Sequence, residues 1–345
     1  MAGRYACRMR IWSCALPEVT EPTPRVWRVV EQIWGRIAEN RSFAGPILSA
    51  AMREFRTLGS KERPVAGDIL TGLMRHERAL ARLRDHPLAA WLQLCREGVP
   101  DLDDPENAYA IAVSLPDWIG AEWWTRLGSD AAIAHARIVA GRAPVTLRVL
   151  REPGEIAIPH HRVGHAIVLE ERTNVHLLDA FRHGDVEVQD LGSQRIAEAA
   201  FPGVGGTVLD LCAGAGGKSL ALAALGARVQ AWDVRRDALV ELDRRARRCR
   251  LDVHIGPPSG RYDVVLVDAP CSGTGVLRRH PENRWKLRFP IGEQRELYAR
   301  AQTMAGRVVY ATCALTRREN EEIAPGGETL WPEDGGRDGF YVATG

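Results

Sequence analysis

The stretch Tyr262–Leu277, which reads YDVVLVDAPCSGTGVL, indicates the class of fold that this chain adopts. Its first part is short, apolar and rich in valine, which is typical of a strand buried on both faces of a parallel sheet. Pro270 ends the strand because proline cannot donate a hydrogen bond to a neighbouring strand. Asp268 and Cys271 therefore stand just past the carboxyl end of a strand, where open α/β sheets bind ligands.

Strands and helices alternate on both sides of this stretch. The expected strands are Thr207–Leu211, Arg228–Trp232, Tyr262–Val267, Val308–Thr312 and Gly339–Thr344. The expected helices are Arg195–Ala200, Lys218–Leu225 and Arg236–Arg250. This alternation predicts an α/β fold with a doubly wound, Rossmann-like sheet.

The first 141 residues follow a helical pattern instead. Apolar residues recur every three or four positions between Trp27 and Ile37, and the segments 43–55 and 65–83 continue this spacing. Thr57 or Ser60 is expected to cap the helix over 65–83. The pair Trp123–Trp124 is interpreted as part of a helical core, with stacking on RNA as the less favoured alternative.

A small β-rich segment separates the two patterns. Its expected strands are Val145–Leu150, Ala166–Leu169, Val175–Leu178 and Val186–Val188. We therefore expect three domains: a helical N-terminal domain over 1–141 that is a candidate for RNA binding, a small β-rich subdomain over 142–192, and a Rossmann-like domain over 193–345.

The composition excludes several classes of protein. The 345 residues carry a net charge of +2 and contain no run of about 18 apolar residues, so no membrane span is expected. The basic start of the chain lacks an apolar segment with a cleavage site, and the seven cysteines form no CxxC pair. We expect a reduced, cytoplasmic monomer without a metal site. Only three of the 46 basic residues are lysines, which GC-rich coding explains better than phosphate binding does.

A glycine-rich turn follows the strand Thr207–Leu211. The residues Cys212, Ala213, Gly214, Ala215, Gly216, Gly217 and Lys218 form this turn and the start of a helix. Glycines let the backbone approach a ligand, and a helix N-terminus favours a negative group. Asp233, 19 residues after Gly214, ends the next strand, where an acid can hold ribose hydroxyl groups. Methyltransferases and nicotinamide dehydrogenases share this pattern, and the spacing does not match that of a phosphate-binding GxxxxGK loop.

A second cysteine follows another expected strand. Cys313 comes directly after Val308–Thr312, so it lies at the same edge as Asp268 and Cys271 if the two strands are neighbours. A lone cysteine is usually a small buried hydrophobe, which is the interpretation for Cys7, Cys14, Cys95, Cys212 and Cys249. Two cysteines at successive strand ends beside a cofactor loop indicate a reactive site.

These motifs resemble those of a known family. The segments DLCAGAGGKS (210–219), DAPCSGTG (268–275) with RRHPENRWK (278–286), and ATCALTRRENE (311–321) are similar to motifs of the RNA cytosine-5 methyltransferases of the Sun/Nop family. Bacterial 16S ribosomal RNA enzymes are the most similar members. The resemblance covers about 144–345 and is strongest from 189 onward.

The resemblance implies a reaction and assigns roles to residues. It implies transfer of a methyl group from S-adenosylmethionine to carbon 5 of a cytidine in RNA, with ribosomal RNA favoured over transfer RNA. Cys313 would add to carbon 6 of the base, Asp268 would bind the N3 and N4 edge, and Cys271 would assist proton removal and release. The cofactor would contact the Cys212–Lys218 loop, Asp233 and Asp268. Lys286 is a candidate helper or RNA contact, with an ordinary surface lysine as the even alternative.

Four arginines next to the cysteine motifs, namely Arg278, Arg279, Arg317 and Arg318, are predicted to contact phosphate. Those of the helix over 236–250 are predicted to form a solvated face.

The chain also departs from the family pattern. Ile255 and Gly256 stand where an acid near the adenine is usual, and no helix is expected within 148–156 or 322–326. These departures support an alternative function, a non-catalytic RNA-binding or ribosome-assembly factor with the same fold. A dehydrogenase is a third and weaker alternative.

Overall fold

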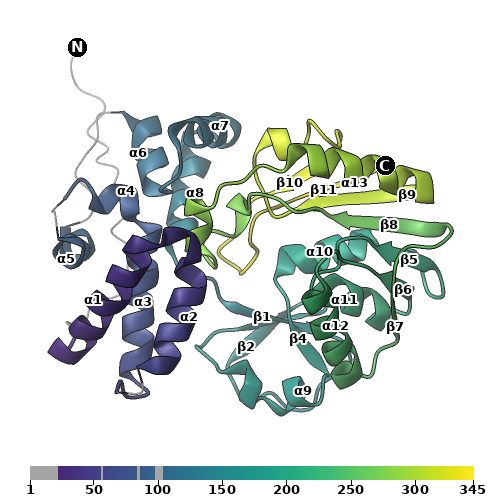
Figure 1. Cartoon of the computed structure of the whole chain (residues 1–345), viewed down its shortest axis with the longest axis horizontal. Helices are drawn as coiled ribbons and strands as arrows, with labels where there is room; N and C mark the ends of the chain where they lie inside the picture. The colour runs from purple at the N-terminus through teal and green to yellow at the C-terminus, as the bar shows by residue number, and fades with distance from the viewer. Residues whose placement is uncertain (1–21, 56, 84–85, 98–103) are drawn as a thin grey trace. The chain divides into compact units, whose positions relative to one another are not determined.

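The computed structural model describes residues 22–55, 57–83, 86–97 and 104–345. By contacts the chain divides into two compact units. One unit contains the chain up to Arg142 together with Val276–Leu287, and the other contains Ala143–Gly275 and Arg288–Gly345 (Figure 1). Within the described residues, no helix combines the length and the apolar character needed to cross a membrane. The basic start of the chain, with Cys7 and Cys14, lies outside the described residues.

The first unit is helical, as predicted. Its helices are α1 (Pro24–Glu39), α2 (Ala44–Glu54), α3 (Glu62–Arg75), α4 (Glu77–Leu80), α5 (Pro87–Glu97), α6 (Pro105–Ala112), α7 (Asp117–Leu127) and α8 (Ser129–Ala140), with the 3₁₀ helices η1 (Arg41–Phe43) and η4 (Pro281–Trp285). Thr23 caps α1, because its hydroxyl accepts from the amide of Val26. The predicted cap of α3 is wrong: the residue before α3 is Lys61, and the carboxylate of Glu62 instead accepts from the amide of Gly59.

Of the tryptophan pair, Trp123 follows the core interpretation, and Trp124 is half-buried against Tyr109. Trp123 is fully buried and its ring meets the edge of His135, with the ring centroids 5.4 Å apart. A ring in this position has no face open to a base.

A small antiparallel sheet opens the second unit. Its strands are β1 (Val145–Val149), β2 (His160–Val163), β3 (Ala166–Leu169) and β4 (Val186–Val188), in the order β2-β3-β1-β4. The predicted strand Val175–Leu178 is wrong, because Val175–Leu177 is the 3₁₀ helix η2. The side chain of Asn174 accepts from the amide of His176, which starts a turn in place of a strand. The short helix α9 (Asp179–Arg182) follows.

The second sheet of this unit has seven strands in the order β10-β11-β9-β8-β5-β6-β7. They are β5 (Thr207–Asp210), β6 (Arg228–Ala231), β7 (Val253–Ile255), β8 (Tyr262–Asp268), β9 (Ala305–Thr312), β10 (Glu328–Leu330) and β11 (Phe340–Thr344). The strands β5 to β9 pair in parallel, whereas β11 and β10 are antiparallel additions at one edge. The strand order changes direction between β5 and β8, and ligands bind at such a switch point.

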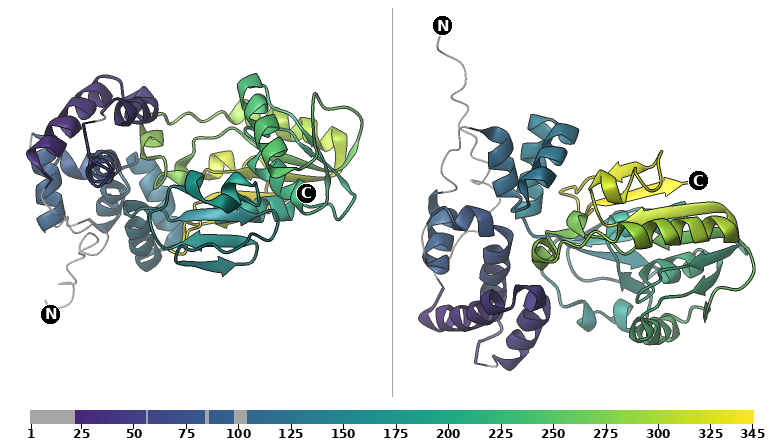
Figure 2. Two further views of the ribbon diagram at one scale, coloured as in Figure 1. Left: turned by 90° about the horizontal axis from the view of Figure 1, so that it is seen from below. Right: turned by 45° about the horizontal axis from the view of Figure 1, so that its top comes forward.

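Helices cover both faces of this sheet. The helices are α10 (Leu191–Ala199), α11 (Gly217–Ala224), α12 (Arg236–Cys249) and α13 (Ile291–Met304). Helices α11 and α12 pack on the side of β6 and β7, and α13 packs on β8 and β9, along which it runs in the right-hand view of Figure 2. The doubly wound fold predicted from the sequence is thereby confirmed.

The structure adds one feature to the division into domains. The segment Val276–Leu287 belongs with the helical unit, although the sequence pattern placed it in the Rossmann-like domain. The boundary between the small subdomain and that domain stays a proposal.

Candidate active site

Three strands direct the candidate residues to one edge of the large sheet. Strands β5 and β8 pair in parallel, and so do β8 and β9, with Asp268 opposite Ala311. Cys313 follows Ala311 by two residues, so it comes to the same edge as Asp268. The prediction that the two cysteine-bearing strands are neighbours is confirmed.

The two cysteines touch at this edge. Their Sγ atoms lie 3.3 Å apart, and neither side chain is fully exposed. The hydrogen bond with Cys313 and burial both raise the pKa of the Cys271 thiol well above its usual range. Cys271 is therefore a protonated thiol at neutral pH, which makes it a weak nucleophile.

Gly275 allows the two cysteine loops to approach each other. Its amide donates to the carbonyl of Cys313, 2.8 Å away, and its carbonyl accepts from the amide of Gly339. A Cβ atom on Gly275 would lie 2.1 Å from the carbonyl oxygen of Gly339. Only glycine fits this position.

A buried glutamate fastens the two loops together. Glu319 is fully buried and accepts from the amide of Ser272 at 2.7 Å, from its hydroxyl at 2.6 Å and from the hydroxyl of Thr316 at 2.8 Å. Gln294 of α13 donates to the same carboxylate. Glu319 lies in the segment ATCALTRRENE, but its burial and its partners could not be predicted from the sequence.

Lys218 pairs with Asp268. Its Nζ atom lies 2.6 Å from Oδ2 of Asp268, at the start of α11. Burial alone would lower the pKa of Lys218, but the charge and hydrogen bond of Asp268 outweigh burial and raise it. Lys218 was expected to support the cofactor loop, and the structure joins it to the catalytic candidate Asp268.

The glycine-rich turn is built around Asp233. The amide of Gly214, whose φ is +55°, donates to Oδ2 of Asp233 at 2.8 Å. Arg235 holds the same carboxylate through its backbone amide and its guanidinium group. Burial opposes ionisation of Asp233, but the hydrogen bonds from Arg235 and Gly214 outweigh it and lower the carboxyl pKa.

Gly216 serves packing, because at a φ of +83° its Cβ would lie 1.9 Å from Cδ1 of Leu242 on α12. Burial raises the pKa of the Cys212 thiol, which fits its predicted role as a packed side chain.

A cavity of about 570 Å³ lies over this turn. Its lining includes Cys212–Ala215, Trp232–Arg235, Asp268, Pro270, Cys271, Arg288 and Glu293. Gly216, Gly217, Lys218 and Cys313 are not among the residues that line it. The donor set suits a nucleoside cofactor, because Asp233 offers carboxylate oxygens to ribose hydroxyl groups and Trp232 and Val234 offer apolar surface to a base. Of the departures seen in the sequence, the absence of an acid is confirmed at the end of β7, where Ile255 is the last residue of the strand and Gly256 follows it.

The structure shows which of four residues predicted to contact RNA are exposed to solvent. Arg278 is only 2 % exposed and packs in the helical unit, where its carbonyl accepts from Arg75. The prediction of a phosphate contact by Arg278 is therefore wrong, since a buried guanidinium cannot reach RNA. Lys286 is exposed and also belongs to the helical unit. Arg317 and Arg318 are exposed, and their contact with phosphate stays a prediction.

Part of the chain matches the model of a known family. Residues 201–326 match the model of a family described as 16S rRNA methyltransferase RsmB/F. S-adenosylmethionine, the cofactor expected from the sequence, is the methyl donor that this match implies.

Curated relatives carry related names. The ribosomal RNA small subunit methyltransferase B of Proteus mirabilis is 35% identical over 199 residues, which are 51% of this chain and 46% of that protein. The probable ribosomal RNA small subunit methyltransferase B of Bacillus subtilis is 30% identical over 288 residues, or 71% of this chain and 64% of that protein. The chain thus spans between 46% and 64% of the length of these two relatives.

Solved structures share the fold. The crystal structure of the protein PH0851 covers 92% of this chain and 97% of its own, with a TM-score of 0.71 and 20% identity. A methyltransferase homologue from Pyrococcus horikoshii covers 70% of this chain and 99% of its own, with a TM-score of 0.60 and 20% identity.

Proposed function

We propose that the chain methylates carbon 5 of a cytidine in RNA, with ribosomal RNA as the favoured substrate, because residues 201–326 match the model of the family described as 16S rRNA methyltransferase RsmB/F. The observation that carries this proposal is the meeting of Asp268, Cys271 and Cys313 beside the cavity of the glycine-rich turn. S-adenosylmethionine supplies the methyl group when it is bound. Bacterial ribosomal RNA lies in the cytoplasm, where we expect the protein to act.

Cys313 is the proposed nucleophile. Carbon 5 of cytosine is a poor nucleophile until a thiolate has added to carbon 6. Cys313 stands in the segment ATCALTRRENE, whose cysteine adds to carbon 6 in the family that these motifs resemble. Once carbon 5 carries the methyl group, the Cys271 thiol first gives its own proton to solvent, and the resulting thiolate takes the carbon-5 proton. The electron pair of that C–H bond restores the double bond between carbons 5 and 6, and Cys313 leaves carbon 6 as a thiolate.

Asp268 and Lys218 orient the base and favour its reactive state. Asp268 would bind the N3 and N4 edge of the cytosine. Lys218 keeps a positive charge next to Asp268, and that charge also favours a nearby thiolate. Asp233 and the amides of Cys212–Ala215 would hold the cofactor on the other side of the cavity.

Two single substitutions test the roles of the cysteines. Cys313→Ala should abolish methyl transfer, whereas Cys271→Ala should accumulate a covalent protein–RNA adduct that survives denaturing electrophoresis. Cys95→Ala, a cysteine of the helical unit, is the matched control and should keep full activity. An adduct trapped by Cys313→Ala would reverse the two assignments.

A ribosome-assembly factor without catalysis is the second candidate. It is favoured by the absence of an acid after β7 and by the contact of Arg235 with Asp233, where a ribose would bind. Calorimetry with S-adenosylmethionine separates the two functions, because no binding at millimolar ligand would leave only the assembly role. Bisulfite mapping of RNA from cells with and without the gene would then identify the cytidine.

A further inference from the structure

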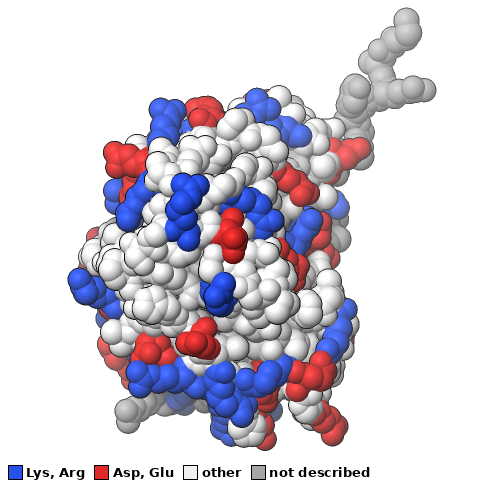
Figure 3. All heavy atoms as spheres, turned by 90° about the vertical axis from the view of Figure 1, so that its right-hand side faces the viewer, with Lys and Arg blue, Asp and Glu red and all other residues white. Residues whose placement is uncertain are grey.

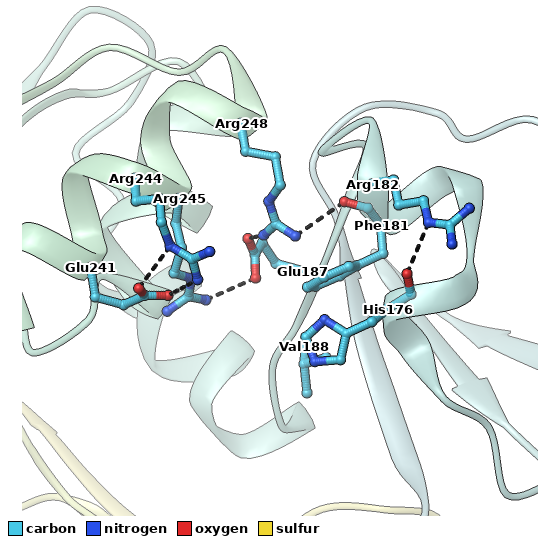
Figure 4. A pocket seen from close by; sticks show the side chains of 9 residues that line it. All are labelled: His176, Phe181, Arg182, Glu187, Val188, Glu241, Arg244, Arg245 and Arg248. Atoms are coloured by element: carbon cyan, nitrogen blue, oxygen red, sulfur yellow. Dashed lines mark hydrogen bonds and ion pairs between the residues drawn. The ribbon is translucent and has the colours of Figure 1, made fainter.

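A second cavity, of about 700 Å³, lies between the small sheet and α12, and we call it the α9–α12 pocket (Figure 4). One wall comes from the small subdomain, with His176, Phe181, Arg182, Glu187 and Val188. The other wall comes from α12, with Glu241, Arg244, Arg245 and Arg248. It shares no lining residue with the cavity over the glycine-rich turn.

The two walls are fixed to each other. Gly184, at a φ of +73°, packs so closely on α12 that a Cβ atom would lie 2.4 Å from the carbonyl oxygen of Arg248. Arg151 of the small subdomain donates to the carbonyl of Cys249 at 2.6 Å, and Arg248 donates to the carbonyl of Phe181 at 3.1 Å. A ligand would therefore meet a pocket that is already formed.

The floor of the pocket carries excess positive charge. Glu187 is 4 % exposed and receives hydrogen bonds from both Arg245 and Arg248, so one carboxylate is shared by two guanidinium groups. Across the whole lining, four arginines face two glutamates, which leaves two positive charges. The helix α12 was predicted to be only a solvated face, but Arg245 and Arg248 are partly buried in this network.

The rim offers cations that can change partner. The side chains of Arg182 and Arg244 are 55% and 76% exposed, and their ion pairs with Asp179 and Glu241 face solvent. Exposed pairs of this kind contribute little stability, so a phosphate can replace the carboxylate. Figure 3 shows basic side chains gathered along the lower edge of the face it presents, the height at which α9 and α12 lie in Figure 1.

Between these cations lies a patch of rings. His176 meets Phe181 edge to face at 5.1 Å, and the guanidinium of Arg248 lies 3.9 Å from the centre of the Phe181 ring. Val188 beside them is 48% exposed. Rings and a guanidinium plane next to solvent-exposed cations match the chemistry of a nucleotide, which has an apolar flat base and an anionic phosphate.

We propose that the α9–α12 pocket binds one unpaired nucleotide of the substrate RNA, away from the methylated cytidine. The base lies against His176 and Phe181, and the phosphates on its two sides meet Arg182 and Arg244 at opposite ends of the pocket (Figure 4). This inference rests on the proposed function insofar as RNA is the substrate. It gives the small subdomain and α12 a joint role in positioning RNA.

The test compares two double variants with the same loss of charge. Arg182→Ala with Arg244→Ala removes both arginines from the rim of the pocket. Arg195→Ala with Arg247→Ala removes two similarly exposed arginines outside the pocket. Affinity for a labelled 16S ribosomal RNA fragment is measured by fluorescence anisotropy at several salt concentrations. The pocket variant should bind the RNA about tenfold more weakly than the wild type. The slope of log affinity against log salt should become shallower by roughly 1.4, because each single-strand phosphate contact contributes about 0.7 and two are lost. The control variant should keep an affinity and a slope near those of the wild type.

A third variant tests the ring surface. Phe181→Leu keeps an apolar side chain but removes the ring, so RNA affinity should fall by about fivefold with an unchanged salt slope. Circular dichroism checks that this variant is folded. Equal RNA affinities and equal salt slopes for the pocket and control variants would overturn the proposal that the pocket binds RNA. Methyl transfer by the wild type is measured separately: its absence, with RNA binding still dependent on the pocket, would overturn the proposed enzyme and leave the pocket standing.

Discussion

Asp268 and Lys218 form an ion pair that fixes a positive charge next to the candidate catalytic residues. The pair sits at the carboxyl end of β8, beside the touching sulfur atoms of Cys271 and Cys313. The raised pKa of Lys218 keeps its positive charge over the whole physiological range. An enzyme that needs a thiolate benefits from such a fixed cation nearby.

Replacing Lys218 should slow the reaction of the nucleophile. In a Cys271→Ala background, Lys218→Met should lower the rate of Cys313 alkylation by iodoacetamide at pH 7.5 about tenfold, because a fixed positive charge no longer favours the thiolate. Lys218→Arg keeps the charge and should keep the rate. An unchanged rate in Lys218→Met would show that Lys218 acts on Asp268 alone.

The sequence predicted the three candidate catalytic residues but not how they are supported. Asp268, Cys271 and Cys313 follow apolar strands, and parallel strands deliver their carboxyl ends to one edge. The direction of the Lys218 side chain depends on the shape of the turn before α11, which the order of residues does not reveal. The buried state of Arg278 was missed because its neighbours are helices some 200 positions earlier in the chain, such as the one that carries Arg75.

At the scale of elements, the turn before α11 is closed by packing against α12. Gly216 has a positive φ and lies against Leu242, whereas a Cβ on Gly217 would meet only Nε2 of Gln189, at 3.9 Å. Gly216→Ala should therefore lower the free energy of unfolding by roughly 1–3 kcal/mol, through strain and a forced shift of Leu242. Urea unfolding measures this, and Gly217→Ala is the control, expected to stay within about 0.5 kcal/mol of wild type.

The junction between the two cysteine loops should depend on the acceptor atoms of Glu319. Glu319→Gln keeps the size of the side chain but replaces one acceptor oxygen with an amide NH2 group. This group would face the donors of Ser272 or Thr316 that the oxygen had accepted from. We expect a loss of about 2–4 kcal/mol in the free energy of unfolding, because a buried network is left with unmatched donors. A free energy of unfolding equal to that of the wild type in urea titration would mean that the hydrogen bonds of the carboxylate do not hold these loops together.

The central elements were predictable and the edge elements were not. Strands β5, β8 and β9 are apolar runs buried on both faces, so their composition alone indicates them. Strands β7 and β10 have three residues each and little burial, which gives no clear pattern. Helix α13 buries only Gln294 and Ala301, so it lacks the apolar stripe by which a helix is found.

At the scale of the whole molecule, the helical unit contains two histidines that must stay neutral. Burial, with help from nearby arginines, lowers the pKa of His76 and of His135 to about 3. An unfolded histidine titrates near pH 6.5, so below that pH the unfolded chain binds protons that the folded chain rejects. These two groups therefore leave the free energy of unfolding at its full value above about pH 6.5. As the pH falls toward 3, they lower it by about 1.4 kcal/mol per pH unit for each histidine.

Urea unfolding at pH 7.5, 6.0 and 5.0 checks this prediction. Tryptophan fluorescence reports on the helical unit, because Trp91 and Trp123 lie against the two histidines. Replacing both histidines with glutamine should flatten the decline, whereas His161→Gln, at an exposed position, should not. A stability that does not change between pH 7.5 and 5.0 would contradict the buried neutral state.

The excursion Val276–Leu287 has a consequence for the inheritance of this protein. The chain passes between its two units after residues 142, 275 and 287, and the returning segment brings buried Leu277, Arg278 and Arg284 into the helical unit. Arg284 donates to the carbonyls of Met74 and Arg75 there. A gene that lost its first 142 codons would leave this segment without its packing partners. A recombinant that takes the helical unit from a relative therefore keeps these buried contacts matched only if it also takes the dozen codons for Val276–Leu287.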